Sequence, residues 1–271
     1  MVDLLDNVTL LYTDMVGFTE FSKNVSKPQE VVTLLSRLFS KFDELCCQRK
    51  VYKVHTIGDC YVVMGYTGKI AKERRTLAVQ IEEAYKVVQV GLEMIEIISD
   101  EREKTDDPAL KNLDMRIGIH TGRIVGGIIG TKVVRYDIFG PDVLIANKME
   151  SNGQAGAVVI SEATYDLVKK NQWIFDTLEI HEHRDVAIGV IGKAVKSYRV
   201  EQIFAASYSG SDDDEGLGGG EEHEEQEDDG FDELGSGEDS GGSASEEDSE
   251  ASGTDREESG RYLIRSIHSY D

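Results

Sequence analysis

Short apolar runs predict three strands in the first quarter of the chain. Each run is rich in β-branched and aromatic residues, which favour extended structure, and together they cover 8–13, 51–56 and 60–66. The last two runs meet at Ile57-Gly58-Asp59, a sequence typical of a hairpin tip. Asp59 is therefore expected at the tip of a hairpin.

Apolar residues at intervals of three and four predict long helices around this hairpin. Gly17-Phe18-Thr19 turns the chain toward the first helical region, and Ser26-Lys27-Pro28-Gln29 is similar to a capping box at a helix start. A second helix is expected over roughly 72–99, followed by a polar connector at 100–112. The residues expected to be buried are Val31, Val32, Leu34, Leu35, Leu38, Phe39, Phe42 and Leu45 in the first helix, and Leu77, Ile81, Ala84, Val88, Leu92 and Ile95 in the second.

The remaining elements complete an alternating pattern. A second hairpin is expected around Thr121-Gly122, and the following elements are a strand at 133–139, a helix at 141–152, a strand at 157–160, a helix at 161–170 and a final hairpin at 173–203. The order β-α-β-β-α-β predicts an α+β fold of the ferredoxin-like, split-βαβ type with extra C-terminal strands.

Charge divides the chain into two parts. Residues 211–271 contain 23 Asp and Glu against three arginines, a net charge of −20, so the whole-chain value of −23 leaves only −3 for residues 1–210. Gly, Ser and acidic residues dominate this part, and such a composition cannot bury enough apolar surface to order the chain. We therefore predict one folded domain at 1–205 and a disordered acidic tail at 206–271, which should avoid nucleic acid.

Cysteine usage and hydropathy bear on the compartment. The three cysteines, Cys46, Cys47 and Cys60, have no metal-ligand spacing and no disulfide framework, which favours a reducing, cytoplasmic setting. No apolar run approaches the roughly 20 residues of a membrane helix. Contact with a membrane is expected only through regions absent from this sequence.

Asp14 and Asp59 are candidate metal ligands. Asp14 follows the first strand, and Asp59 lies at the hairpin tip, so neighbouring strands would direct both carboxylates to one place. Mg²⁺ that is shared with substrate phosphates is held by one or two carboxylates and keeps open positions. A single Gly-Asp turn is usually structural, but two acidic turns of this kind favour a site.

Four sequence motifs resemble the catalytic domain of class III adenylyl and guanylyl cyclases over residues 3–203. They are TDMVGFT at 13–19, TIGD at 56–59, MRIGIHTG at 115–122 and YDIFG at 136–140. The resemblance implies a dimer with active sites at its interface, where two Mg²⁺ or Mn²⁺ ions assist attack of the ribose 3′-hydroxyl on the α-phosphate of GTP or ATP. The sequence at 142–168 is similar to the second catalytic half of ciliate and apicomplexan guanylyl cyclases, which weakly favours cGMP.

The resemblance assigns roles to individual residues. It implies that Asp14 and Asp59 bind the metals, with Met15 beside them, and that Arg116 contacts a phosphate. Gly17, Phe18 and Thr19 correspond to the segment that offers backbone N–H groups to the phosphates. Without the resemblance, Arg116 would be read as a surface strand arginine.

Two positions depart from the pattern of a complete catalytic half. The helix at 141–152 carries Leu144 and Lys148 where the family has an asparagine and an arginine, and Asn147 is three residues out of register. Lysine keeps the charge but not the planar fork of arginine, whereas leucine donates no hydrogen bond. Leu144 could otherwise be a core leucine. The pattern resembles the metal-binding half of a heterodimeric cyclase, whose partner domain supplies the missing groups.

His55 and Asp137 occupy the positions that distinguish adenine from guanine in the family. The aspartate matches adenylyl cyclases and the histidine matches neither class, so the sequence does not choose between GTP and ATP. In a metal-binding half, both residues would line the second, non-catalytic pocket. A catalytically silent module that binds nucleotide and dimerises remains an alternative, and the Gly-Gly-acid signature of diguanylate cyclases is absent from residues 1–205.

Overall fold

A computed structural model of the chain describes residues 2–25, 27–66, 75–132, 134–189 and 192–202. The predicted tail at 206–271 lies outside the described residues. Within the described part, no helix is long and apolar enough to cross a membrane.

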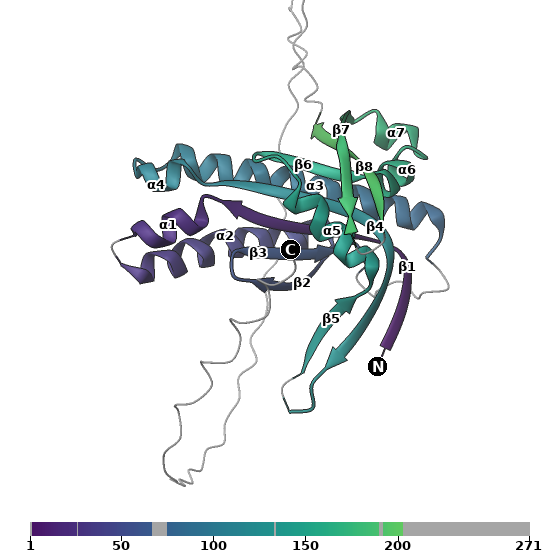
Figure 1. Ribbon diagram of the computed structural model, residues 1–271, viewed down its shortest axis with the longest axis horizontal. Helices are drawn as coiled ribbons and strands as arrows, with labels where there is room; N and C mark the ends of the chain where they lie inside the picture. Colours follow the sequence, from purple (N-terminus) through teal and green to yellow (C-terminus); the bar gives the residue numbers. More distant parts are fainter. Residues whose placement is uncertain (1, 26, 67–74, 133, 190–191, 203–271) are drawn as a thin grey trace, which may run out of the picture. The chain divides into compact units, whose positions relative to one another are not determined.

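One eight-stranded sheet organises the domain, with the strand order β2-β3-β1-β4-β6-β8-β7 and β5 paired to β4 (Figure 1). The strands are β1 (Val2–Val16), β2 (Tyr52–Ile57), β3 (Cys60–Met64), β4 (Asp114–Ile129), β5 (Arg135–Phe139), β6 (Ala157–Ser161), β7 (Leu178–Ile188) and β8 (Lys193–Gln202). β1 and β4 are antiparallel neighbours at the centre, with β3 beyond β1 and the parallel β6 beyond β4. The predicted split-βαβ plan with extra C-terminal strands is confirmed.

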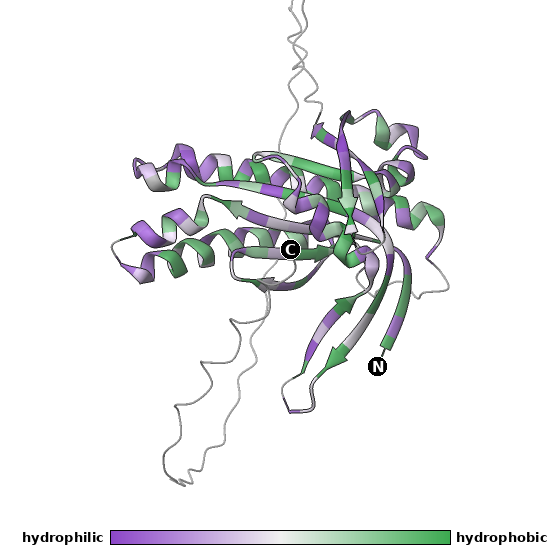
Figure 2. Cartoon of the chain, in the orientation of Figure 1, coloured by the Kyte–Doolittle hydropathy of each residue, from purple (hydrophilic) through white to green (hydrophobic). Residues whose placement is uncertain are grey.

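Helices pack on both faces of this sheet. They are α1 (Phe18–Asn24), α2 (Pro28–Arg49), α3 (Leu77–Glu103), α4 (Pro108–Lys111), α5 (Pro141–Ser151), α6 (Glu162–Val168) and α7 (Gln172–Phe175). Alternation along β1 separates two cores: Leu11 packs with residues of α2 and α3, whereas Leu10 and Tyr12 pack with Ala146 of α5. Figure 2 shows hydrophobic residues concentrated in the central strands and in the helix faces turned toward them.

The predicted hairpin around Thr121-Gly122 is wrong, because β4 continues without a turn through both residues. Thr121 lies opposite Thr9 of β1, and their hydroxyls are 2.8 Å apart in the interior. A Cβ at Gly122 would come within 2.4 Å of the Asp142 carboxylate, so this glycine allows α5 to approach rather than the chain to turn. The hairpin lies instead between β4 and β5, where Ile129 pairs with Arg135.

Some element boundaries also differ from the predictions. The connector expected at 100–112 is partly helical, because α3 continues to Glu103 and α4 covers Pro108–Lys111. The first helical region is two helices, and α2 has Lys27 at its N-cap without a side-chain hydrogen bond, so the predicted capping box is wrong. Ser26 lies outside the described residues.

Candidate active site

Asp14 and Asp59 meet at one end of the β1–β3 pair. Asp14 lies inside β1, two residues before its end, and not in a turn after the strand as predicted. Asp59 lies in the two-residue turn between β2 and β3, as predicted. The Tyr61 N–H donates to Thr13 Oγ1 at 3.0 Å, which fixes the start of β3 against β1. The Met15 N–H lowers the pKa of the Asp59 carboxyl, so the hairpin tip lies near the strand that carries Asp14.

Arg116 joins this pair from the neighbouring strand. It lies directly opposite Asp14 in the β1–β4 register, and its Nη2 donates to Asp14 Oδ2 at 2.5 Å. Its Nε donates to Glu150 Oε1 at 3.0 Å. One guanidinium is therefore held between two carboxylates that come from different elements, β1 and α5.

Glu150 is a site residue that the sequence reasoning missed. It is 5% exposed in the last turn of α5, one helical turn after the buried Ala146. A charged residue on the buried stripe of a helix is the signal that could have revealed it, because such residues are rarely buried without a partner.

Burial, together with the negative charge of Asp14, shifts the pKa of two acidic groups in the site. Burial and the negative charge of Asp14 raise the pKa of Glu150 to about 7, and Arg116 offsets part of this effect. Burial, followed by the charge of Asp14, also raises the pKa of Asp59. Burial alone would lower the pKa of Arg116, but its hydrogen bond to Glu150 and the two carboxylates raise it. The site therefore holds three carboxyl groups, those of Asp14, Asp59 and Glu150, around the single positive charge of Arg116. This charge balance favours the binding of further cations.

This donor set fits divalent metal ions that are completed by other ligands. Among the described residues, no group of three or more His, Cys, Asp and Glu is placed to enclose a metal. Asp14 and Asp59 can supply hard oxygen ligands, and water and substrate phosphates must supply the rest. The Met15 side chain lies in the core at 3% exposed, so only the backbone of this residue could contact a metal.

Gly17, Phe18 and Thr19 lie directly after β1 and begin α1. Gly17 has φ 85° at the N-cap, and no side chain caps the first turn. A Cβ at Gly17 would also meet the Asn112 carbonyl oxygen at 3.0 Å. The turn therefore requires glycine, and Thr19 is exposed next to the strand end that carries Asp14.

His55 and Asp137 contact each other. His55 Nδ1 lies 3.2 Å from Asp137 Oδ1, and both side chains are 11% exposed. Arg135 donates to the other Asp137 oxygen at 2.5 Å. Burial lowers the pKa of His55 despite the neighbouring carboxylate, so the imidazole is mostly neutral at pH 7. The structure thus brings these two residues together on β2 and β5.

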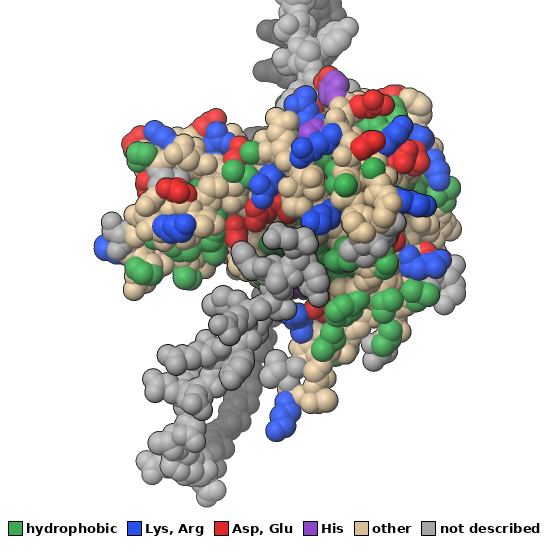
Figure 3. Space-filling model, viewed as in Figure 1, with side chains coloured by type: hydrophobic (Ala, Val, Ile, Leu, Met, Phe, Trp, Pro, Cys, Tyr) green, Lys and Arg blue, Asp and Glu red, His purple; other side chains and the backbone are tan. Residues whose placement is uncertain are grey.

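Leu144 and Lys148 lie one turn apart on the outer surface of α5. Leu144 is 45% exposed, which excludes the core-leucine interpretation, and Lys148 is also exposed. Within the described part of the chain, Lys148 forms no ion pair. Figure 3, viewed as in Figure 1, shows acidic side chains gathered near the middle of the picture, over β1 and beside α5.

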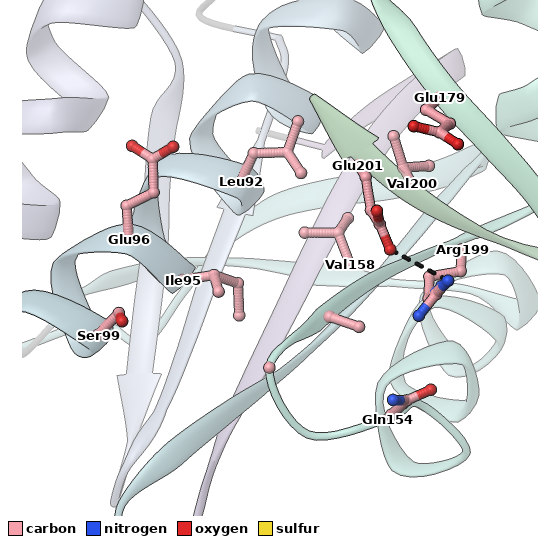
Figure 4. A pocket seen from close by; sticks show the side chains of 12 residues that line it. Leu92, Ile95, Glu96, Ser99, Gln154, Val158, Glu179, Arg199, Val200 and Glu201 are labelled. Atoms are coloured by element: carbon pink, nitrogen blue, oxygen red, sulfur yellow. Dashed lines mark ion pairs between the residues drawn. The ribbon is translucent and has the colours of Figure 1, made fainter. Parts of the chain in front are cut away.

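A groove elsewhere on the domain does not include these residues. A groove of about 670 Å³ runs between α3 and strands β6 and β8, with Leu92, Ile95 and Val158 among its lining residues (Figure 4). Glu201 at its rim is paired with Arg199. This groove contains none of the predicted site residues.

Comparison with known proteins identifies relatives of the whole domain. The family model described as adenylate and guanylate cyclase catalytic domain matches residues 2–202. Guanylate cyclase alpha of Plasmodium falciparum is 39% identical over 173 residues, and the guanylate cyclase of Toxoplasma gondii is 41% identical over 167 residues. These matches cover 63% and 62% of this chain but 4% of each relative, so the chain spans a small part of their length.

Solved structures share the fold. The adenylyl cyclase CyaB from P. aeruginosa has a TM-score of 0.63 at 22% identity, with 76% of this chain and 98% of that chain covered. The guanylate cyclase domain of RhGC from Catenaria anguillulae, in complex with GTP, has a TM-score of 0.60 at 24% identity, with 74% and 98% covered.

Proposed function

This chain belongs to the adenylate and guanylate cyclase catalytic domain family, and from that premise we propose that it is the metal-binding half of a dimeric nucleotide cyclase. The observation that carries the proposal is an asymmetry within one domain. Asp14, Asp59 and Arg116 are assembled at one strand end, whereas α5 presents an exposed leucine and a lysine where the family pattern has an asparagine and an arginine.

The proposed reaction converts a purine nucleoside triphosphate to its 3′,5′-cyclic monophosphate. The ribose 3′-hydroxyl releases its proton to solvent, and a bond forms between its oxygen and the α-phosphorus. The bond from that phosphorus to the β-phosphate bridging oxygen breaks, and pyrophosphate leaves. Two Mg²⁺ or Mn²⁺ ions would lower the pKa of the 3′-hydroxyl and neutralise the triphosphate. Asp14 and Asp59 would hold both ions, together with the backbone at Met15.

The remaining residues of this chain would orient the triphosphate. The Arg116 guanidinium carries several N–H donors in a planar fork, which suits phosphate oxygens. Backbone N–H groups at Gly17, Phe18 and Thr19 lie next to Asp14 in sequence and lack side-chain caps, so they are available to the same phosphates. Lys148 retains a positive charge on the surface of α5.

A second cyclase domain would complete the site. Large apolar side chains are exposed on the arm that β4, β5 and the start of β1 form, and contiguous exposed apolar surface of this kind indicates a protein interface. They are Val2 (77%), Leu4 (47%), Ile128 (53%), Ile129 (50%), Val134 (61%) and Phe139 (46%). Such a partner would also supply the transition-state donors that Leu144 and Lys148 do not provide.

GTP is the substrate that we favour. The relatives described above are guanylate cyclases, and they match this chain at 39% and 41% identity. His55 Nδ1 lies 3.2 Å from Asp137 Oδ1 without forming a hydrogen bond, so in this chain the two base-reading positions contact one another. The choice of base would then be made by the partner domain.

The test measures cyclic nucleotide production by the full chain. The chain is incubated with Mn²⁺ and either GTP or ATP, alone and mixed with a cyclase domain that carries the asparagine and arginine. Product is expected only from the mixture, and Asp14→Ala should abolish it, whereas Asp106→Asn on an exposed loop should not.

Robust production by the chain alone would overturn the half-site proposal. Loss of one preorganised transition-state donor typically costs about 10²–10³ in rate, so a homodimer that lacks two should be nearly inactive. Absence of product in every mixture, with nucleotide still bound, would instead favour the silent dimerisation module.

A further inference from the structure

The Glu150 carboxylate is the most deeply placed acid of the site. Its side chain is 7% exposed, compared with 34% for Asp14, and its hydrogen bond is directed at Arg116. An ionised carboxylate in the interior is costly unless a cation or donor compensates it. Neither metal binding nor a phosphate contact requires an acid at this position, so its presence needs a separate explanation.

The two edges of the Arg116 guanidinium have different partners. Its Nη2 donates to Asp14, and its Nε donates to Glu150. A metal ion at Asp14 would compete with Arg116 for the same carboxylate, because cation and guanidinium both seek its lone pairs. The contact with Glu150 involves no proposed metal ligand, so it can persist when the first contact is lost.

We propose that Glu150 is a positioning residue that anchors the Nε edge of Arg116. The guanidinium then keeps its position when the Asp14 carboxylate binds a metal ion instead of Arg116. The inference rests on the proposed function for two roles, that of Asp14 as a metal ligand and that of Arg116 as a phosphate contact. Anchored by Nε, Arg116 presents its Nη groups to phosphate with less loss of side-chain entropy than a free arginine.

Packing of α5 on β4 fixes the position of Glu150 independently of its contact with Arg116. A Cβ at Gly118 would lie 1.9 Å from the Glu150 backbone nitrogen, so the end of α5 lies directly on β4, two residues from Arg116. The start of α5 is also attached to β4, because the Arg123 N–H donates to Asp142 Oδ2 at 2.6 Å. Glu150 is thus carried by a helix that is docked at both ends.

A purely structural role makes different predictions from an anchoring role. If Glu150 only balanced charge or packed the helix, Glu150→Gln and Glu150→Ala would differ in stability but not in the state of Arg116. If it anchors Arg116, the glutamine oxygen should still accept the Nε–H, whereas alanine should release it. Glu83→Gln is the matched control, because Glu83 forms a similar pair with Arg75, 2.7 Å long and largely buried.

The experiment observes the Arg116 Nε–H group directly by ¹⁵N–¹H NMR of the full chain, with the signal assigned from its loss in Arg116→Lys. A slowly exchanging signal is expected in the wild type, in Asp14→Asn, in Glu150→Gln and in Glu83→Gln. Glu150→Ala should lose the slow exchange. Addition of Mg²⁺ and pyrophosphate to the wild type should leave the signal in place.

Pyrophosphate binding in the presence of Mg²⁺, measured by calorimetry, gives the second readout. Glu150→Ala should weaken it about tenfold or more, the scale of a hydrogen bond to a charged group, and Glu150→Gln should remain close to wild type. A protected Nε–H signal in Glu150→Ala, or its loss on adding Mg²⁺, would overturn the anchoring role. Failure of the wild type to bind Mg²⁺ would count against the proposed function alone. The NMR signal of the metal-free chain would still show whether Glu150 holds the Arg116 Nε–H group.

Discussion

Gly118 of β4 lies directly against Glu150 of α5, with no space between the two backbones for a side chain. A Cβ at Gly118 would come within 2.5 Å of the Glu150 Cα and within 1.9 Å of its nitrogen. The same strand carries Arg116 and the same helix carries its buried partner, so this contact sets the distance between them. Close packing of helix on strand is therefore part of how the site is built.

Gly118→Ala should destabilise the domain and reduce activity together. The added methyl group must push α5 away from β4, and overpacking of this kind typically costs about 1–3 kcal/mol. Urea unfolding measures the first effect, and product formation by the reconstituted dimer measures the second. Gly189→Ala is the control, since a Cβ there would meet nothing within 4 Å. Equal stability of the two variants would show that α5 can move freely at this contact.

Asp59→Asn should separate metal-free stability from metal binding. Burial and repulsion from Asp14 raise the pKa of Asp59, so its charge is unfavourable in the folded chain without metal. The asparagine oxygen can still accept the Met15 N–H, and the metal-free midpoint of thermal unfolding should therefore rise.

The same variant should lose the stabilisation that Mn²⁺ gives. A ligand at 100 times its Kd stabilises the folded state by about 2.7 kcal/mol, and this increment should shrink when a metal ligand is removed. Thermal unfolding with and without Mn²⁺ measures both effects, with Asp106→Asn as the exposed control. An unchanged Mn²⁺ response would contradict the assignment of Asp59 as a ligand.

Glu150 should make metal-free stability fall as pH rises toward neutrality. Its folded pKa of about 7 exceeds the ordinary value of 4.5, so between these values the folded state binds more protons than the unfolded state. The free energy of unfolding then decreases with increasing pH, by at most about 1.4 kcal/mol per pH unit for one proton, and levels off above pH 7.

Glu150→Gln tests this prediction because it has no titrating group at the position. The stability difference between wild type and variant, from urea unfolding with a chelator between pH 5 and 8, should change in favour of the variant as pH rises. Asp59 contributes in the same direction to both proteins. Parallel stability curves for the two proteins would show that Glu150 ionises normally.

Local patterns in the sequence were sufficient for the parts of the fold that are set by neighbours along the chain. The strand at Val8 to Tyr12 and the hairpin tip at Asp59 depend on β-propensity and turn chemistry, and both are confirmed. Thr121-Gly122 misled the prediction because a glycine after threonine is typical of a turn. Here Gly122 instead makes room for Asp142, a contact 20 residues away that no local pattern reveals.

Only part of the candidate site could be predicted from the sequence, for the same reason. Asp14 and Asp59 follow apolar runs, so their position at strand ends could be inferred from sequence. Glu150 acquires its role only when α5 docks on β4 and buries it beside Arg116. The exposure of Leu144 likewise depends on which face of α5 meets the sheet, and a weak hydrophobic pattern in this short helix leaves that face undetermined.

Restoring the two missing donors should convert this chain toward a self-sufficient enzyme. Leu144 and Lys148 are exposed one turn apart on α5, so Leu144→Asn combined with Lys148→Arg can be made without disturbing the core. In a homodimer, each site would then have the metal ligands of one copy and the donors of the other. Cyclic nucleotide production by the chain alone should rise by about 10²-fold or more, since a single preorganised donor is worth about 10²–10³.

Two further variants determine where the gained activity arises. Asp14→Ala in the same double variant should abolish the gain, because both sites would lose a metal ligand. Asn147→Ala in the same double variant should not, because Asn147 lies out of register with the restored pair. Cyclic nucleotide measured with GTP and ATP separately would also show which base the restored homodimer accepts. No gain in a folded, dimeric double variant would mean that α5 does not face the partner's metal site.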